Sequence, residues 1–218
     1  MRCIECASRC LLRGLLCGAV LVATGCAQFA SVAPTGTKPT LAPAPKPVKI
    51  EPPIAPESRQ IYEQALAALD AHRYVDAEKL LLTVARREPT VAGPHANLGV
   101  LYARTNRGKQ AIEALQEAIR LNPDRAAYHN ELGMVYRREG KFTDARRSYE
   151  KALEVDANYA YAHLNIAILY DLYMQEPERA LPHYQRYREL EPKEAATVTK
   201  WIADLQQRAE KGKGGKSG

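Results

Sequence analysis

Residues 95–123 read HANLGVLYARTNRGKQAIEALQEAIRLNP, and this stretch decides the fold because the chain repeats it. A second copy begins 34 residues later, and a third follows with one extra residue in its internal turn. A fainter copy precedes the first. The matching positions, copy by copy, are Ile61, Ala65, Ala77, Leu81 and Pro89; His95, Leu98, Gly99, Tyr102, Ala111, Leu115 and Pro123; His129, Leu132, Gly133, Tyr136, Ala145, Tyr149 and Ala157; and His163, Ile166, Ala167, Tyr170, Ala180, Tyr184 and Pro192.

Each copy contains two stretches with helical periodicity, joined by a short turn. Small residues in the first stretch and alanines in the second allow the two helices to approach closely, and the tyrosines fill the space between copies. One copy alone leaves an apolar face bare, and stacking the copies buries it. The period and its pattern resemble the tetratricopeptide repeat (TPR) family, apart from the tryptophan that usually opens that repeat.

The resemblance implies an all-α fold, a right-handed TPR superhelix (α-solenoid) of about four helix-turn-helix repeats plus a C-terminal capping helix. We expect a degenerate repeat over 58–91 and three further repeats over 92–125, 126–159 and 160–193. The capping helix is expected over 194–210, and a basic, glycine-rich tail over 211–218. The expected helices are 58–71, 74–87, 92–105, 108–121, 126–139, 142–155, 160–174, 178–190 and 193–210.

The last expected helix has apolar residues at helical spacing, which predicts a face that covers the fourth repeat. These residues are Val198, Trp201, Ile202 and Leu205, and we expect Trp201 to anchor the cap. The opposite, solvated face is predicted to carry Asp204, Gln206, Gln207 and Arg208.

Residues 1–25 have the features of an export signal, with three arginines followed by an apolar run of nine residues from Leu15 to Ala23. That run is too short to span a bilayer of roughly 30 Å but suits the core of a signal peptide. The run leads into Ala23-Thr24-Gly25-Cys26, which resembles the lipobox of bacterial lipoprotein precursors. The resemblance implies cleavage before Cys26 and its modification with diacylglyceryl and N-acyl chains, such as palmitate. A plain secretory signal cut nearby is the alternative.

The position of the cysteines supports this interpretation. All five lie in the first 26 residues, so a lipidated mature chain has no thiol left for a disulfide. Cys3-x-x-Cys6 has neither a second pair nor a nearby histidine to make it a redox or zinc motif. By the lipoprotein family's sorting rule, Ala27 after the cysteine implies the outer membrane, facing the periplasm.

Residues 26–57 are expected to link the lipidated cysteine to the repeats. Eight prolines in this segment exclude helix and central strand, because proline fixes φ and lacks an amide donor. A polyproline-like chain of this length extends the repeats up to roughly 90 Å from the lipid.

The family's usual ligand surface is the concave groove formed by the first helices. The predicted peptide-binding groove residues are Tyr62, Leu66, Asn97, Val100, Arg104, Asn130, Met134, Arg137, Arg138, Leu164, Asn165 and Ile168. Four of them occupy equivalent positions and form an apolar row: Leu66, Val100, Met134 and Ile168. Asp171 is also expected on this face.

The apolar row and the nearby arginines suit an extended peptide or an amphipathic helix that carries acidic groups, with the asparagines holding its backbone. The groove lacks the family's carboxylate-clamp pattern, so recognition of a chaperone C-terminus is not implied. Packing against the chain's own linker or tail, and self-association, are the alternatives.

The function that follows is a membrane-anchored scaffold or adaptor that binds other proteins of the bacterial cell envelope. The chain resembles TPR lipoproteins that assist envelope machines, such as pilotins of type IV pili, adaptors for peptidoglycan hydrolases, and TPR proteins of TonB-type energy transduction. No catalytic motif is present, so neither an enzyme nor a cofactor is predicted.

Metal and nucleic acid are the remaining ligand classes. His95, His129 and His163 form a column that suggests a metal-binding module, but equivalent helices stand roughly 8–10 Å apart, too far for shared ligands. The net charge falls from +6 to +4 when residues 1–25, with three arginines and one glutamate, are removed. Interleaved charges and an export signal argue against nucleic acid.

Overall fold

The computed structural model describes residues 53–214, which are helical and contain no strand. The helices are α1 (Pro56–Asp70), α2 (Tyr74–Arg87), α3 (Ala92–Arg104), α4 (Gly108–Leu121), α5 (Ala126–Arg138), α6 (Phe142–Val155), α7 (Ala160–Ile168), the π-helical turn η1 (Leu169–Tyr173), α8 (Pro177–Leu190), the 3-10 turn η2 (Pro192–Glu194) and α9 (Ala195–Gly214). Helix starts match the expected ranges to within two residues, and α9 continues four residues beyond its expected end. The all-α fold is therefore confirmed.

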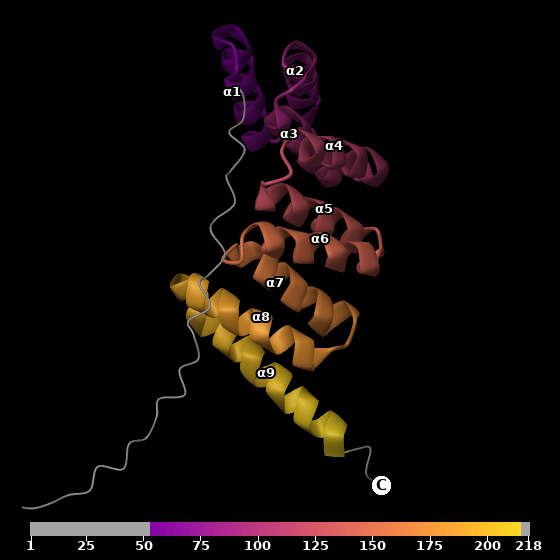
Figure 1. Cartoon of the computed structure of the whole chain (residues 1–218), viewed down its shortest axis with the longest axis vertical. Coiled ribbons are helices and arrows are strands. Elements are labelled where there is room, and N and C mark those ends of the chain that lie inside the picture. The colour runs from indigo at the N-terminus through magenta and orange to yellow at the C-terminus, as the bar shows by residue number, and fades with distance from the viewer. Residues whose placement is uncertain (1–52, 215–218) are drawn as a thin grey trace, which may run out of the picture. The chain divides into compact units, whose positions relative to one another are not determined.

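The helices form pairs that stack along the described part of the chain (Figure 1). α1 packs on α2, α3 on α4, α5 on α6, and α7 on α8, while α9 packs on α8. Successive first helices also touch, α3 with α5 and α5 with α7. No helix among residues 53–214 is both long and apolar enough to cross a bilayer.

The core is built from the residues that define the repeat. The alanines of the second helices, Ala77, Ala111, Ala145 and Ala180, are fully buried. Gly133 shows why its position needs a small residue, because a Cβ atom there would lie 2.5 Å from Cε1 of Tyr149. Tyr149 is itself fully buried, so the two helices of this pair meet along the tyrosine ring.

A cation lies over the repeated tyrosine in three pairs, a feature that the repeat pattern did not predict. The Arg107 guanidinium lies 4.3 Å from the ring centroid of Tyr102, that of Arg179 lies 4.1 Å from Tyr170, and the Lys141 ammonium lies 5.9 Å from Tyr136. Arg107 also donates two hydrogen bonds to Glu78 of the preceding pair, with N–O distances of 2.9 and 2.8 Å. These bonds lower the pKa of Glu78 and tie the first two pairs together.

The extra residue of the fourth repeat lies in the helix and not in the turn, so the prediction of a longer turn is wrong. Each turn between paired helices contains one residue with positive φ: His72, Asn106, Gly140 or Gln175. In the first three turns the amide that follows this residue bonds back five residues, as from Lys141 to Tyr136, whereas in the fourth the amide of Glu176 bonds back six residues to Tyr170. The chain therefore keeps its turn and absorbs the insertion in η1, as a π-bulge does.

The cap differs from the expectation at Trp201, and Arg208, though exposed, makes a contact that was not predicted. Val198, Ile202 and Leu205 are buried as predicted, but Trp201 is 41% exposed and touches the core only at its edge, 6.0 Å from the Tyr184 ring. Arg208, expected on the solvated face, reaches Asp171 at 2.9 Å. Asp171 is 8% exposed, so it holds the cap instead of facing the groove.

Candidate functional site

The predicted groove residues lie on α1, α3, α5, α7 and the ends of these helices; we call their side of the stack the first-helix face. Its apolar row consists of Leu66, Val100, Met134 and Ile168. Leu66 and Met134 are 36% and 37% exposed, while Val100 and Ile168 are half-buried. The row therefore offers partly exposed apolar side chains that alternate with better covered ones.

The polar residues of this face connect successive first helices. Nδ2 of Asn97 donates a hydrogen bond of 2.6 Å to the Tyr62 hydroxyl, and Nδ2 of Asn165 donates one of 3.0 Å to Oδ1 of Asn130. Asn130 and Asn165 are 2% and 8% exposed. Their structural role is to link α5 with α7. Contact with a peptide backbone stays a prediction, and Asn97, which is half-buried, is the best placed for it.

Three arginines give this face its charge. Arg104 and Arg138 are exposed at the ends of α3 and α5, and Arg137 is half-buried with its guanidinium 5.8 Å from the Tyr173 ring centroid. None of the three forms an ion pair with another residue of 53–214. Nη1 of Arg137 is buried and lacks a hydrogen-bond partner within the same range. A guanidinium in this state favours an anionic ligand.

A carboxyl group lies within the field of these arginines. Glu131 is half-buried on α5, and burial raises its pKa, while the positive charge of Arg104 opposes that rise. Burial also raises the pKa of Tyr149, whose hydroxyl has no hydrogen-bond partner among the described residues. Glu131 and the Tyr149 hydroxyl therefore place polar groups on α5 and α6, next to the apolar row.

The π-helical turn adds two exposed apolar residues that sequence reasoning missed. Leu172 and Tyr173 are 63% and 47% exposed, and the Tyr173 ring lies 5.2 Å from that of Phe142. The sequence contained one signal, the 35-residue spacing of the last copy, but not where the extra residue would be absorbed. Leu164, in the middle of α7, is half-buried against the core.

Two predicted features fall outside the described residues. Cys26, the predicted lipidation site, and residues 26–52 of the expected linker precede the described residues, whereas the end of the expected linker is helical, since α1 begins at Pro56. Their roles stay predictions.

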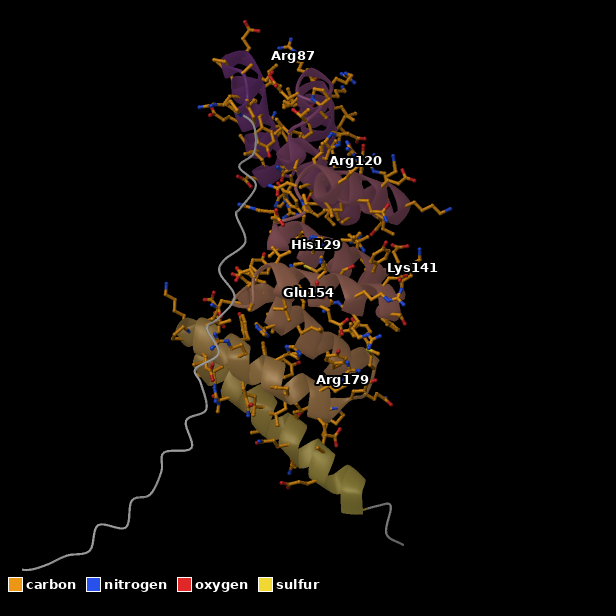
Figure 2. The ribbon with its side chains drawn as sticks, in the orientation of Figure 1. Arg87, Arg120, His129, Lys141, Glu154 and Arg179 are labelled. Carbon is orange, nitrogen blue, oxygen red and sulfur yellow. The ribbon has the colours of Figure 1, made fainter. Side chains whose placement is uncertain are left out.

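The histidine column does not converge, so a metal site within it is not supported. His129 and His163 each bond through Nε2 to a backbone carbonyl six residues earlier, that of Pro123 at 2.8 Å and that of Ala157 at 3.1 Å. Figure 2 labels His129 beside Glu154 of α6, one of the charged residues that act on its ring. No group of three or more His, Cys, Asp or Glu residues within 53–214 is arranged to hold a metal ion.

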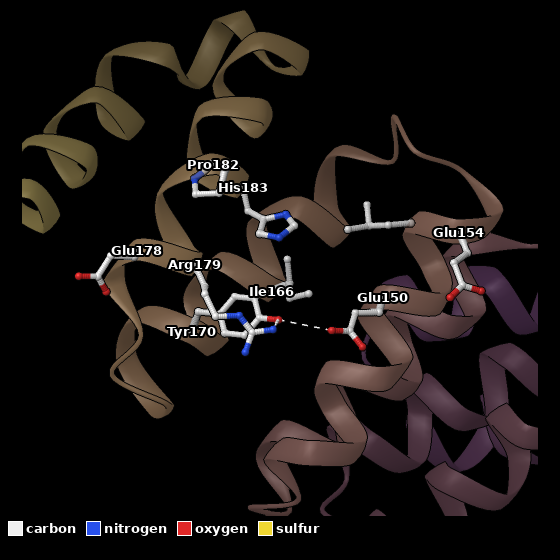
Figure 3. A pocket seen from close by; sticks show the side chains of 9 residues that line it. Glu150, Glu154, Ile166, Tyr170, Glu178, Arg179, Pro182 and His183 are labelled. Atoms are coloured by element: carbon white, nitrogen blue, oxygen red, sulfur yellow. Dashed lines mark hydrogen bonds between the residues drawn. The ribbon is translucent and has the colours of Figure 1, made fainter. Parts of the chain in front are cut away.

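One histidine of the column meets a partner from the opposite helix of its pair. Nδ1 of His163 lies 3.0 Å from Nδ1 of His183 on α8, a residue for which no partner was predicted. His183 lines an open cavity of about 690 Å³ between α6 and α8, together with Glu150, Glu154, Tyr170 and Arg179 (Figure 3). Aligning the repeats marks His183 as unusual, because the equivalent second-helix residues are Leu80, Ala114 and Ser148. Its contact with His163 is set by the packing of α7 on α8.

The half-buried His183 predicts a pH dependence of stability. Burial, His163 and Arg179 lower the pKa of His183 from 6.5 to about 4, so the folded protein holds it neutral while the unfolded chain takes up a proton below about pH 6.5. The contribution is present above pH 6.5 and is lost as the pH falls towards 4. Between pH 7 and 4.5 we expect the free energy of unfolding of wild type to fall by about 1–2 kcal/mol more than that of His183→Gln. This range is reduced because His183 is partly exposed to solvent. Urea titrations at both pH values measure it, and equal losses would contradict it.

The family comparison covers the repeats. The family model described as "Tetratricopeptide repeat" matches residues 62–126, 96–160 and 130–171, which together span half of the chain. A comparison with curated proteins found no match.

Several solved structures share the fold. The crystal structure of MamA is 25% identical, with a TM-score of 0.57, and the match covers 64% of this chain and 81% of that one. TTC0263, a thermophilic TPR protein of Thermus thermophilus, is 25% identical, with a TM-score of 0.59 and coverages of 69% and 81%. The first TPR of Spaghetti (RPAP3), bound to the HSP90 peptide SRMEEVD, is 21% identical, with a TM-score of 0.51 and coverages of 55% and 95%, and shows the fold alone.

The fold of stacked helix pairs indicates a surface for binding other proteins, since these repeats act as scaffolds. With the repeat positions, the packing of the pairs and the family model in agreement, this chain belongs to the tetratricopeptide repeat family.

Proposed function

We propose that this protein is a lipid-anchored scaffold of the bacterial cell envelope that binds a peptide segment of another envelope protein on its first-helix face. The observation that carries the proposal is the set of arginines without ion pairs beside the apolar row. Arg104, Arg137 and Arg138 suit acidic side chains, and Leu66 and Met134 suit the apolar side chains of an extended or helical segment.

The fold supports a peptide as the ligand. The Spaghetti TPR, which shares this architecture, is bound to the peptide SRMEEVD, an acidic segment with one methionine. The present face differs in chemistry, since two of its asparagines are buried in contacts between helices. A ligand of this chain therefore meets arginines and apolar side chains before it meets amide groups.

The anchor rests on the sequence alone. The Ala23-Thr24-Gly25-Cys26 motif and the absence of any other cysteine after residue 26 support lipidation of Cys26. Several acyl chains give stable anchoring, which a single chain does not. The outer membrane, with the repeats facing the periplasm, is the location that this anchor and Ala27 favour.

The first-helix face is tested by charge reversal. Arg104→Glu/Arg138→Glu should weaken binding of an acidic partner at least about tenfold, because each lost charge-assisted contact is worth roughly 1.5–3 kcal/mol. Crosslinked affinity purification from membranes compares this variant with wild type. The matched control is Lys109→Glu/Arg147→Glu, with the same change of net charge on exposed residues of α4 and α6.

The outcomes separate the functional classes. Loss of secretin or pilus subunits only from the Arg104→Glu/Arg138→Glu variant would establish a pilotin-like assembly factor. Loss of wall hydrolases or TonB-system proteins would establish an adaptor. Equal capture by all three proteins would overturn the role of this face. Cys26→Ser in the same fractionation should leave the membrane pellet and lose palmitate labelling, and its retention with the label would overturn the anchor.

A further inference from the structure

We propose that His163 and His183 form a binding site for one divalent transition-metal ion of the kind that prefers imidazole, Zn(II) or Cu(II). The site lies between α7 and α8, beside the cavity of Figure 3, which His183 lines. It uses a pair of histidines within one repeat and not the column of histidines along the stack. It is independent of the first-helix face.

The distance between the two nitrogens fits two ligands of one ion. Nδ1 of His163 and Nδ1 of His183 are 3.0 Å apart. Imidazole nitrogens bind such ions at about 2.0–2.1 Å, so two ligands of one ion lie roughly 2.9–3.4 Å apart, depending on the angle at the metal. Only a small opening of the pair is needed to admit the ion.

The orientation of His163 matches that of a metal ligand. Its Nε2 lies 3.1 Å from the carbonyl oxygen of Ala157, which requires the proton on Nε2 and leaves the lone pair on Nδ1. Ligating histidines commonly donate their second nitrogen to a carbonyl in this way, which fixes the ring and its tautomer. His183 is held by the Tyr170 ring, stacked at 6.0 Å.

The ring of His183 can present its Nδ1 without any net release of protons. Without metal, His183 donates its Nδ1 proton to Nδ1 of His163, since that nitrogen has the free lone pair. On binding, the proton moves from Nδ1 to Nε2 of His183 and both Nδ1 lone pairs face the ion. The neutral form of each ring is the ligand.

The cavity gives the ion access from solvent. Carboxylates of Glu150, Glu154 and Glu178 line it, and Arg179 is the cation that lines it. Arg179 already pairs with Glu176 at 2.7 Å and lies over the Tyr170 ring, so part of its charge is compensated. Since no third protein ligand is in place within 53–214, solvent completes the coordination and a micromolar affinity is expected.

The other repeats show what distinguishes this pair. His95 and His129 occupy the same position as His163, but the residues equivalent to His183 are Ala114 and Ser148. His129 even makes the same carbonyl bond, to Pro123 at 2.8 Å. These two histidines are therefore built-in controls that lack only the second imidazole.

The test measures Zn(II) binding by the untagged full chain in detergent, in competition with a chromophoric chelator of micromolar affinity. The variants are His163→Gln and His183→Gln, with His95→Gln and His129→Gln as controls. We expect one ion per chain for wild type and for both controls. Binding should be at least about tenfold weaker for His163→Gln and for His183→Gln, because removing a group that only supports a metal ligand already costs about 10–100-fold in affinity. Any cysteine in the chain contributes equally to all five proteins.

Cu(II) electron paramagnetic resonance of wild type provides a measurement that needs no variant. Hyperfine coupling to two imidazole nitrogens, reduced to one in His183→Gln, supports the site. Absence of Zn(II) binding, or equal weakening in all four variants, would overturn it and leave the pair as a hydrogen bond between neutral rings. Circular dichroism of each variant verifies that the helices are intact.

Discussion

Tyr149→Ala is expected to lower the free energy of unfolding by about 3–5 kcal/mol, the range for truncating a buried aromatic residue. The Tyr149 ring is fully buried and fills the space that Gly133 leaves between α5 and α6. Truncation removes its contacts and leaves a cavity in the core that spans α6 to α9. Urea unfolding followed by circular dichroism measures the change.

Tyr149→Phe is the matched control, and we expect it not to lower the free energy of unfolding. The Tyr149 hydroxyl is buried without a hydrogen-bond partner among residues 53–214, so removing it deletes a desolvated polar group and keeps the ring. We expect unchanged or slightly higher stability. A loss of about 1 kcal/mol or more in Tyr149→Phe would show that the hydroxyl has a partner, such as a buried water.

Arg208→Met is expected to cost about 2–3 kcal/mol, because it leaves the Asp171 carboxylate buried without its ion pair. The Asp171 side chain is 6% exposed, and its Oδ1 forms an ion pair with Nη1 of Arg208 at 2.9 Å. Its Oδ2 accepts hydrogen bonds from Nη2 of Arg208 and from the Tyr184 hydroxyl, each at 3.3 Å. The expected cost lies below that of a fully buried pair since the Arg208 side chain is 46% exposed. Thermal and urea unfolding measure it.

The double-mutant cycle should be asymmetric. Asp171→Asn costs less, about 1 kcal/mol, because the guanidinium left behind is hydrated. Asp171→Asn/Arg208→Met should resemble Asp171→Asn alone, since no charge is then stranded. Lys200→Met is the control, because it removes one cation from an exposed position of α9 that forms no ion pair within residues 53–214, and it is expected to change stability by less than about 0.5 kcal/mol. Additive costs in the double variant would refute the stranded-charge explanation.

The cap shows how far the pattern of a helix determines its contacts. Val198, Ile202 and Leu205 were predictable because apolar residues at helical spacing define one face. The roles of Trp201 and Arg208 were not, because both lie at the border of that face. Which border residue turns inward depends on the neighbouring helix, here on Asp171 and its need for a counter-ion.

The sequence by itself determined the helices, their pairing and the family. These properties repeat every 34 residues, so small and apolar residues at the same positions must meet the same neighbours in each copy. The predicted groove residues follow from the same register, and their ligand remains to be tested by the Arg104 and Arg138 variants.

The tertiary structure alone decided what departs from the repeat. It placed the extra residue in η1, which exposes Leu172 and Tyr173, and it joined His163 to His183. Each outcome depends on which rotamer, helical turn or hydrogen bond two particular side chains adopt when their helices pack. Periodicity describes the average of the copies, and these contacts exist because one copy differs from the others.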